Sequence, residues 1–124
     1  MKTIFVNIGL NVSSSDTIGQ LLYPAGIPTE YALDMLKAVP GMFYIVSQEM
    51  AQSETEPTLV LELRTMEHSA GLARFFDGLS RALHQDCIAA YDPAAQRGGL
   101  FGPKADAWGP FNPAYFISPE TQAA

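Results

Sequence analysis

Two segments of the chain alternate apolar and polar residues with a period of two, which is typical of half-buried β-strands. They cover residues 3–12 and residues 58–65. The apolar side chains take the even positions in the first segment and the odd positions in the second. Each segment therefore predicts a strand with one face directed to a core. The inward-facing sets are Ile4, Val6, Ile8, Leu10 and Val12, and Leu59, Leu61 and Leu63.

A helical period follows each of these predicted strands. Apolar residues recur at i, i+3, i+4 and i+7 within residues 29–39, and Pro40–Gly41 ends that helix. Residues 69–83 carry a second stripe, with Ser69 as the expected N-cap. Residues 13–28 begin with polar residues and end in glycine and proline, so we expect a long loop there. The two stripes consist of Ala32, Met35, Leu36 and Val39, and of Leu72, Phe75, Phe76, Leu79 and Leu83.

Two further strands complete the predicted order of elements. Residues 42–50 are rich in aromatic and β-branched residues, and residues 87–91 form a short apolar run. The order is therefore βαββαβ, and right-handed crossovers leave few ways to arrange it. We predict an α+β fold of the ferredoxin-like split βαβ type, a four-stranded antiparallel sheet with both helices on one face. The same elements in another strand order are the alternative.

The C-terminal quarter of the chain differs in composition from the rest. It combines aromatic residues with many prolines and glycines, whereas disordered tails are normally poor in aromatic residues. We therefore expect it to pack on the domain. The chain is predicted to form one domain over residues 1–124, with a βαββαβ core over residues 1–92 and an extension over residues 93–124.

The extension has two predicted positions. It is expected to fold across the helix-free face of the sheet or along a sheet edge, where it would bury Trp108 and Phe111. The alternatives are that it contributes to a dimer contact, or that it walls a pocket together with Phe5 and Tyr44. Each alternative leaves the aromatic side chains covered.

One stretch of the first strand resembles a known family. Residues 4–8 resemble the first-strand motif of RNA-recognition domains, and the βαββαβ order matches that family too. The resemblance implies that Phe5 stacks on a nucleobase. The family's third-strand motif should supply further aromatic residues and a basic residue, but residues 58–64 hold no ring and place Glu62 on the same face. Each missing ring forfeits about 1–3 kcal/mol of stacking energy.

The charge of the chain argues against nucleic-acid binding more strongly. The 124 residues carry a net charge of −6, and the isoelectric point is about 4.6. Phosphate neutralisation by Lys and Arg supplies most of the affinity of nucleic-acid-binding proteins. We therefore expect no nucleic-acid partner, and interpret the acidic surface as a solvated face or as a docking surface for a basic protein.

Cysteine content and hydropathy bear on the location of the protein. Cys87 is the single cysteine, so the chain forms no internal disulfide, which fits a reducing compartment. No apolar run approaches the roughly 18 residues that a membrane-spanning helix requires. We therefore expect a cytoplasmic protein without a membrane partner.

Few side chains offer chemistry. Cys87 lies at the start of a predicted strand and His84 at the end of a helix, but a lone cysteine on an apolar strand is usually part of the core. His68 and His84 lack the spacing of a metal site. We predict no catalytic residue, no metal and no cofactor, and do not expect an enzyme.

The helix-free face of the sheet is the predicted site. Glu62 and Arg64 share this face with Asn7, and buried charges require partners. A network among these three residues would satisfy that need, and the same groups would alternatively orient a polar ligand beneath the aromatic extension. The predicted binding residues are Phe5, Asn7, Asn11, Glu62, Arg64, Trp108, Phe111 and Tyr115.

These observations predict a function class rather than a specific activity. We expect a small, acidic, non-enzymatic interaction module that docks on a protein partner or on itself, as a homodimer, through its sheet. The alternative is a cofactor-independent protein or enzyme of the dimeric α+β barrel type. It would bind a small apolar or aromatic ligand in a pocket on the open sheet face.

Overall fold

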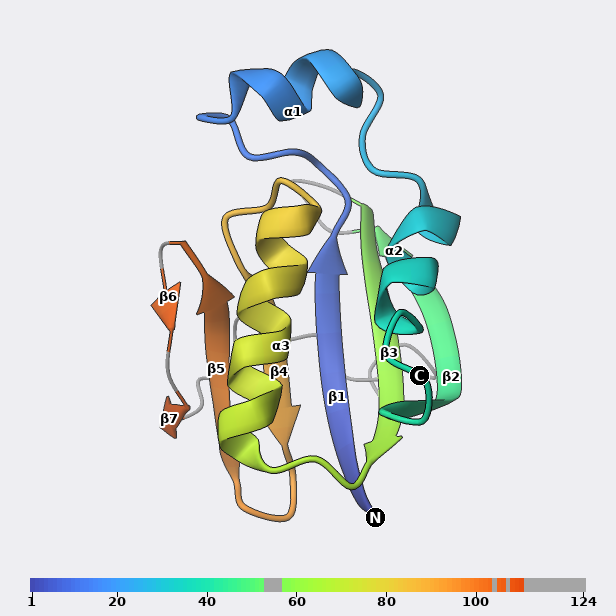
Figure 1. Ribbon diagram of the computed structural model, residues 1–124, viewed down its shortest axis with the longest axis vertical. Coiled ribbons are helices and arrows are strands. Elements are labelled where there is room, and N and C mark those ends of the chain that lie inside the picture. The colour runs from blue at the N-terminus through green and yellow to red at the C-terminus, as the bar shows by residue number, and fades with distance from the viewer. Residues whose placement is uncertain (53–56, 104, 107, 111–124) are drawn as a thin grey trace.

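The computed structural model describes residues 1–52, 57–103, 105–106 and 108–110 of the chain. The strands of this part form one antiparallel sheet, and the helices cover one of its faces (Figure 1). The strands are β1 (Lys2–Gly9), β2 (Phe43–Gln52), β3 (Pro57–Thr65), β4 (Ile88–Asp92), β5 (Arg97–Gly102), β6 (Ala105–Asp106) and β7 (Gly109–Pro110). The helices are α1 (Thr17–Leu22), α2 (Thr29–Leu36) and α3 (Ser69–Ala82).

The predicted α+β class with an antiparallel sheet is confirmed, but the limit of four strands is wrong. Across the described residues the strand order is β2-β3-β1-β4-β5-β6, and β7 also pairs with β5. The additional strands come from residues that we predicted to belong to the C-terminal extension. The sheet therefore continues past β4, and part of the C-terminal extension belongs to it.

A tight turn explains why the chain continues into β5. The carboxylate of Asp92 accepts hydrogen bonds from the backbone N–H groups of Ala94 and Ala95, at 3.1 and 3.2 Å. Gln96 then takes the left-handed backbone conformation, with φ of 55°. Asp and Asn side chains commonly stabilise turns in this way. The turn reverses the chain and sets the pairing of Asp92 with Arg97.

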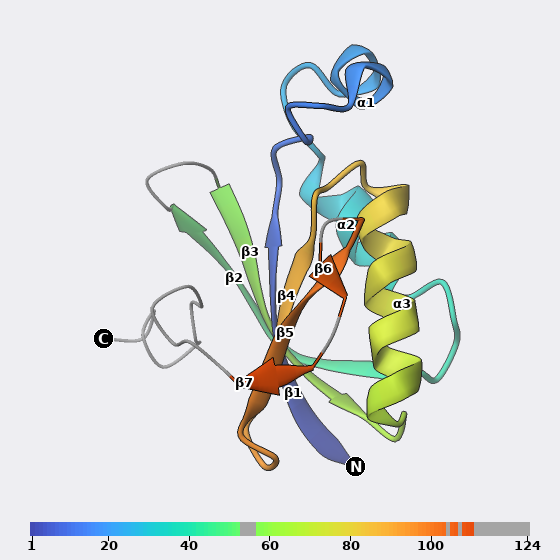
Figure 2. The same ribbon diagram turned by 90° about the vertical axis from the view of Figure 1, so that its left-hand side faces the viewer.

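The register of the central strands confirms which residues face the core. β1 pairs with β3 along its whole length, with Val6 opposite Leu61 and Ile8 opposite Leu59. Both members of each pair are buried on the side of the helices. Viewed along the sheet, α2 and α3 lie on this same side, while α1 projects beyond one end of the strands (Figure 2).

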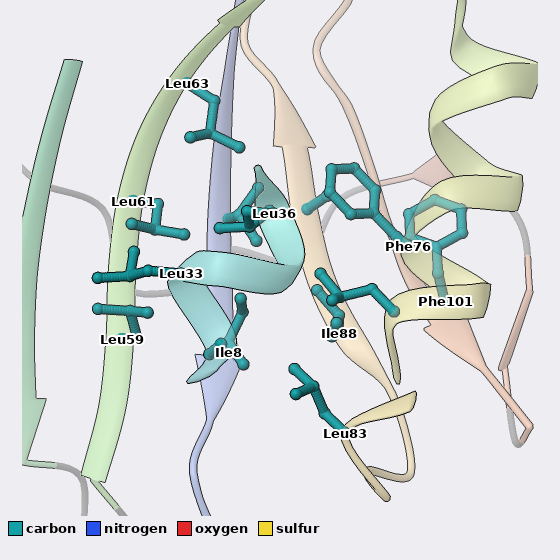
Figure 3. Close-up of a cluster of buried hydrophobic side chains, with 14 of the residues drawn as sticks. Ile8, Leu33, Leu36, Leu59, Leu61, Leu63, Phe76, Leu83, Ile88 and Phe101 are labelled. Atoms are coloured by element: carbon teal, nitrogen blue, oxygen red, sulfur yellow. The ribbon is translucent and has the colours of Figure 1, made fainter. Parts of the chain in front are cut away.

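The core lies between the sheet and the two longer helices. Leu36 of α2 and Phe76 of α3 point toward the central strands, and Phe101 and Ile88 complete the layer from β5 and β4 (Figure 3). These four side chains are buried. Complete burial of each such side chain contributes roughly 1.5–3 kcal/mol to folding. Because Phe101 takes part, β5 is as integral to the core as the predicted strands.

The helices deviate from the sequence prediction at their ends. α2 stops at Leu36, so Val39 lies beyond it and is half exposed, while Leu33 is buried instead. Ser69 is the first residue of α3 rather than its cap, and His68 holds the N-cap position without a side-chain hydrogen bond. The carboxylate of Glu67 instead accepts a bond from the backbone N–H of His68, at 2.8 Å.

A short helix stands where we predicted only a loop. α1 begins after Asp16, whose carboxylate accepts a hydrogen bond from the backbone N–H of Gly19 at 2.8 Å. This is an ordinary N-cap, since Asp is among the preferred residues there. This helix of six residues is too short to produce a periodic pattern that sequence analysis would detect.

Trp108 lies on the helical side of the sheet near the β5 edge, so of the two predicted positions the helix-free face is wrong for this residue. Its indole packs edge-on against Phe101, with ring centroids 4.8 Å apart. The indole N–H donates to the backbone oxygen of Ser69 at 2.8 Å, at the start of α3. The predicted residues Phe111 and Tyr115 lie outside the described residues.

We expect Trp108→Ala to lower the free energy of unfolding by about 2–3 kcal/mol, because it removes a partly buried ring from Phe101 and α3. Trp108→Phe keeps a ring but not the donor, and should cost about 1 kcal/mol. Urea unfolding followed by circular dichroism measures both. A Trp108→Ala variant as stable as the natural chain would show that this contact does not hold the extension in place.

Candidate interaction surface

The structure brings four of the predicted site residues together on the helix-free face. Phe5 lies opposite Glu62 on β3 and opposite Tyr91 on β4, and Asn7 lies opposite Val60. Arg64 follows on the same face of β3. The prediction that these side chains share one face is correct, because the register pairs the odd-numbered residues of β1 with the even-numbered residues of β3.

Two of these residues are less accessible than the prediction assumed. The ring of Phe5 stacks on Tyr91, with centroids 6.5 Å apart and planes inclined by 21°. Asn7 is buried, and the neighbouring Val60 is only 1% exposed. Phe5 therefore already has an aromatic partner within the chain. This face is not the open stacking platform that nucleobase recognition requires.

The two charged members of the polar network predicted on this face are not paired with each other in the described part of the chain. Arg64 is exposed and lies opposite Thr3 and Tyr44. Among the residues that the structure describes, Arg64 makes no ion pair with Glu62, although they are two positions apart on one strand. Exposure explains this, because solvated charges need no mutual partner.

The other two described site residues lie elsewhere. Asn11 lies beyond the end of β1 and lines a surface cavity of about 470 Å³ together with Ser13, Asp86 and Cys87. Within this group the hydroxyl of Ser13 donates to the Asp86 carboxylate at 2.5 Å. Trp108 lines a separate cavity of about 370 Å³ beside the first turn of α3. Neither cavity includes the four residues of the helix-free face.

His84 stabilises a loop and is not paired with Cys87 for catalysis. Its Nδ1 lies 2.7 Å from the carboxylate of Asp16, and its ring packs against Tyr23. The backbone oxygen of His84 also accepts a bond from the N–H of Ser13 at 2.8 Å. These contacts join the segment that carries α1 to the turn after α3. His84 is therefore a structural residue here.

The outer edge of β2 lies at a margin of the sheet, as the predicted split βαβ arrangement implies, but sequence analysis did not identify which of its side chains are exposed. Among the described strands β2 pairs with β3 alone, so it forms one margin of the sheet (Figure 1). Alternate backbone N–H and C=O groups of such an edge strand point away from the sheet. Three large apolar side chains of β2 are exposed: Tyr44 by 65%, Val46 by 41% and Met50 by 47%.

The sequence of β2 contains little that would protect this edge. Natural edge strands are commonly guarded by lysine, proline or a bulge. Residues 43–52 contain no lysine, arginine or proline, and Glu49 is their single charge. A bulge is present at Val46, because Ile45 and Ser47 pair with the consecutive residues Leu63 and Glu62. The lack of basic residues and proline was the signal that could have drawn attention to this strand.

A second exposed apolar group lies on α1, at the end of the sheet. Ile18, Leu21 and Leu22 are more than half exposed on this short helix. The helix is fixed by its buried Gly19, where an added Cβ would approach the side chain of His84 to 2.7 Å. The group is therefore presented by a fixed segment rather than by a long helix with an apolar face.

Neither metal nor membrane chemistry is indicated in the described part of the chain. No group of three or more His, Cys, Asp or Glu side chains there is arranged to hold a metal ion. No helix in the same part is long and apolar enough to cross a bilayer.

We expect the stability contribution of the Asp16 carboxylate to be lost in acid. The Gly19 N–H first, and His84 second, lower the pKa of Asp16 below its usual value. The contribution is thus complete above about pH 4, where the unfolded chain is also ionised, and falls as the pH drops through the folded pKa. Asp16→Asn keeps a capping side chain but no charge, so its deficit in stability relative to the natural chain should be smaller at pH 3 than at pH 7. Asp16→Ala also removes the cap and should be less stable than Asp16→Asn at both pH values. Urea unfolding at the two pH values measures this, and a pH-independent deficit of Asp16→Asn would contradict it.

Comparison with known proteins adds no family to this description. The chain matches no protein-family model, no curated protein and no solved structure. What the protein does must therefore be inferred from its own surfaces, and the edge of β2 is the most distinctive of these.

Proposed function

We propose that this protein is a small, non-enzymatic, cytoplasmic interaction module that docks through its sheet. The observation that carries the proposal is the outer edge of β2, where Tyr44, Val46 and Met50 are exposed beside backbone groups that no described strand pairs with. Tyr44 lies on the helix-free face and Met50 on the helical face, so apolar side chains flank this edge on both sides, and exposed apolar surface commonly marks a protein-interaction site. Main-chain pairing at a sheet edge is a recurrent way to bind a protein segment.

The two margins of the sheet support this choice of surface. β5, at the other side, pairs with both β6 and β7, so short strands cover that margin. β2 is the longest strand, with ten residues, and has no such cover among the described elements. An uncovered strand of this length promotes aggregation, and natural proteins usually protect such edges. A docking function would explain why this edge is left uncovered.

We infer that the underlying unit is ferredoxin-like, extended at one margin. The order β4-β1-β3-β2 within the wider sheet, and the placement of α2 and α3 on one side, support this inference (Figure 2). β5 to β7 are then additions beside β4. In this interpretation the added strands occupy one edge of the unit and leave the opposite edge for a partner.

A second candidate function is binding of a small polar ligand in the cavity beside Cys87. Its volume of about 470 Å³ falls within the range of small-molecule sites. Asn11, Ser13 and Asp86 supply hydrogen-bonding groups there, so the cavity differs from the apolar pocket that we predicted on the open face. A fragment screen by protein NMR tests this candidate. Shifts that cluster at Ser13, Asp86 and Cys87 would support it, and their absence would remove it.

The docking proposal is tested by replacing one apolar edge residue with a charge. We expect Val46→Lys to reduce the recovery of bound protein at least about fivefold, because lysine guards an edge against strand pairing. Leu100→Lys is the matched control, since Leu100 is 45% exposed on β5 at the far side of the sheet. The measurement is quantitative affinity capture from native lysate containing an untagged copy of the chain. Equal recovery by natural chain and Val46→Lys would contradict the proposal.

A further inference from the structure

We propose that the partner at this edge is a second copy of the chain, with two β2 strands paired antiparallel across a two-fold axis at Gln48. The proposal rests on the docking function argued above and names its partner. The two sheets would join into one continuous sheet. Each copy would present the same surface to the other, as in most two-fold homodimers.

The backbone of β2 specifies the kind of partner. Its outward N–H and C=O groups can pair with a row of complementary groups on a neighbouring strand, whose axis would lie about 4.8 Å away. A helix or a compact loop surface satisfies its own backbone groups internally and leaves those of β2 unpaired. The occupant is therefore an extended strand.

The charge of the edge favours a second copy over a basic segment. An edge adapted to a basic strand would carry several acidic residues, as electrostatic complementarity requires. β2 carries Glu49 alone, among ten residues that are otherwise apolar or uncharged. The net charge of −6 therefore lies mostly on other surfaces and does not prevent two copies of this strand from meeting.

The position of Glu49 limits the possible registers. In an antiparallel pair, directly opposite residues lie on the same face of the sheet, and like charges placed opposite each other are destabilising. A two-fold axis at Glu49 would place the two carboxylates opposite each other. An axis at Ser47 would place Glu49 opposite Ile45, and these residues lie on different faces because the bulge intervenes.

An axis at Gln48 avoids both conflicts. It places Val46 of each copy opposite Met50 of the other. The interface therefore contains two equivalent pairs of apolar side chains that are exposed in the single chain. Ser47 then lies opposite Glu49, which separates the two carboxylates. An axis at Met50 would also separate them, but would leave Val46 without a partner. Gln48 on the axis is therefore the register in which the exposed side chains are best matched.

The bulge at Val46 also limits the strength of the dimer. Regular pairing would extend over residues 46–50 only, because the register shift after Ile45 interrupts the ladder on the N-terminal side of Val46. So short a ladder belongs with the small interfaces of weak or transient complexes. We expect a dissociation constant on the order of 100 micromolar.

The first experiment measures the mass of the full chain by light scattering. The protein concentration rises across the series from on the order of micromolar to on the order of millimolar. The natural chain and the matched control Leu100→Lys should pass from monomer to dimer at the same concentration. Val46→Lys should raise the dissociation constant at least about tenfold. A natural chain that remains a monomer throughout, or a Val46→Lys dimer of unchanged affinity, would overturn the proposal.

The second experiment tests the register by oxidative crosslinking. Gln48→Cys would place two thiols opposite each other, at the 4.5–5.5 Å Cα separation of antiparallel pairs, which is roughly the separation that a disulfide requires. It should crosslink at least about tenfold faster than Ser47→Cys, whose thiols would be diagonally offset. The natural chain, with Cys87 alone, controls for crosslinking at that position. Equal rates for Gln48→Cys and Ser47→Cys would overturn the register.

Failure of self-pairing and failure of the docking function give different results. If the natural chain is a monomer, but Val46→Lys loses proteins that the natural chain captures, self-pairing is overturned and docking on another protein stands. If the natural chain is a monomer and the captured proteins are the same for both variants, the docking function is overturned too.

Discussion

The placement of β1 between β3 and β4 is the constraint on which the rest of the structure depends. Its buried residues Ile4, Val6 and Ile8 meet α2 and α3 on one side, while its other face carries Phe5 and Asn7. A shift of the pairing by one residue would exchange the two faces. Burial of the even-numbered side chains therefore fixes the register on both neighbouring strands. It also decides which residues of β3 and β4 the helices cover.

The sheet extends beyond β4 on one side of β1, through β5, β6 and β7. The turn at Asp92 returns the chain beside β4, and Phe101 then enters the same core as Phe76, with ring centroids 6.0 Å apart. Trp108 packs on Phe101 and binds the first residue of α3. Aromatic contacts and one indole hydrogen bond thus make the start of the C-terminal extension part of the domain.

The additional described strands lie beside β4 and leave the margin at β2 exposed. This asymmetry is the basis of the proposed function. β5 to β7 follow β4, whereas β2 ends the sheet on the other side (Figure 1). α2 has only eight residues, so it covers part of the sheet beside β2 and leaves Met50 exposed on the helical face. The incomplete cover and the backbone edge that no described strand pairs with occur on the same strand, where the proposed docking surface lies.

The sequence by itself determined the elements whose pattern is local. Alternation assigned the two faces of β1 and β3, and the helical period identified the buried stripe of α3, because both patterns repeat within one element. It also placed Phe5, Asn7, Glu62 and Arg64 on one face. Only the tertiary structure decided that residues 97–102 join the sheet, that Phe5 stacks on Tyr91, and that Tyr44, Val46 and Met50 of β2 are exposed. Strand order and exposure arise from contacts between residues distant in the chain, and no local period records them.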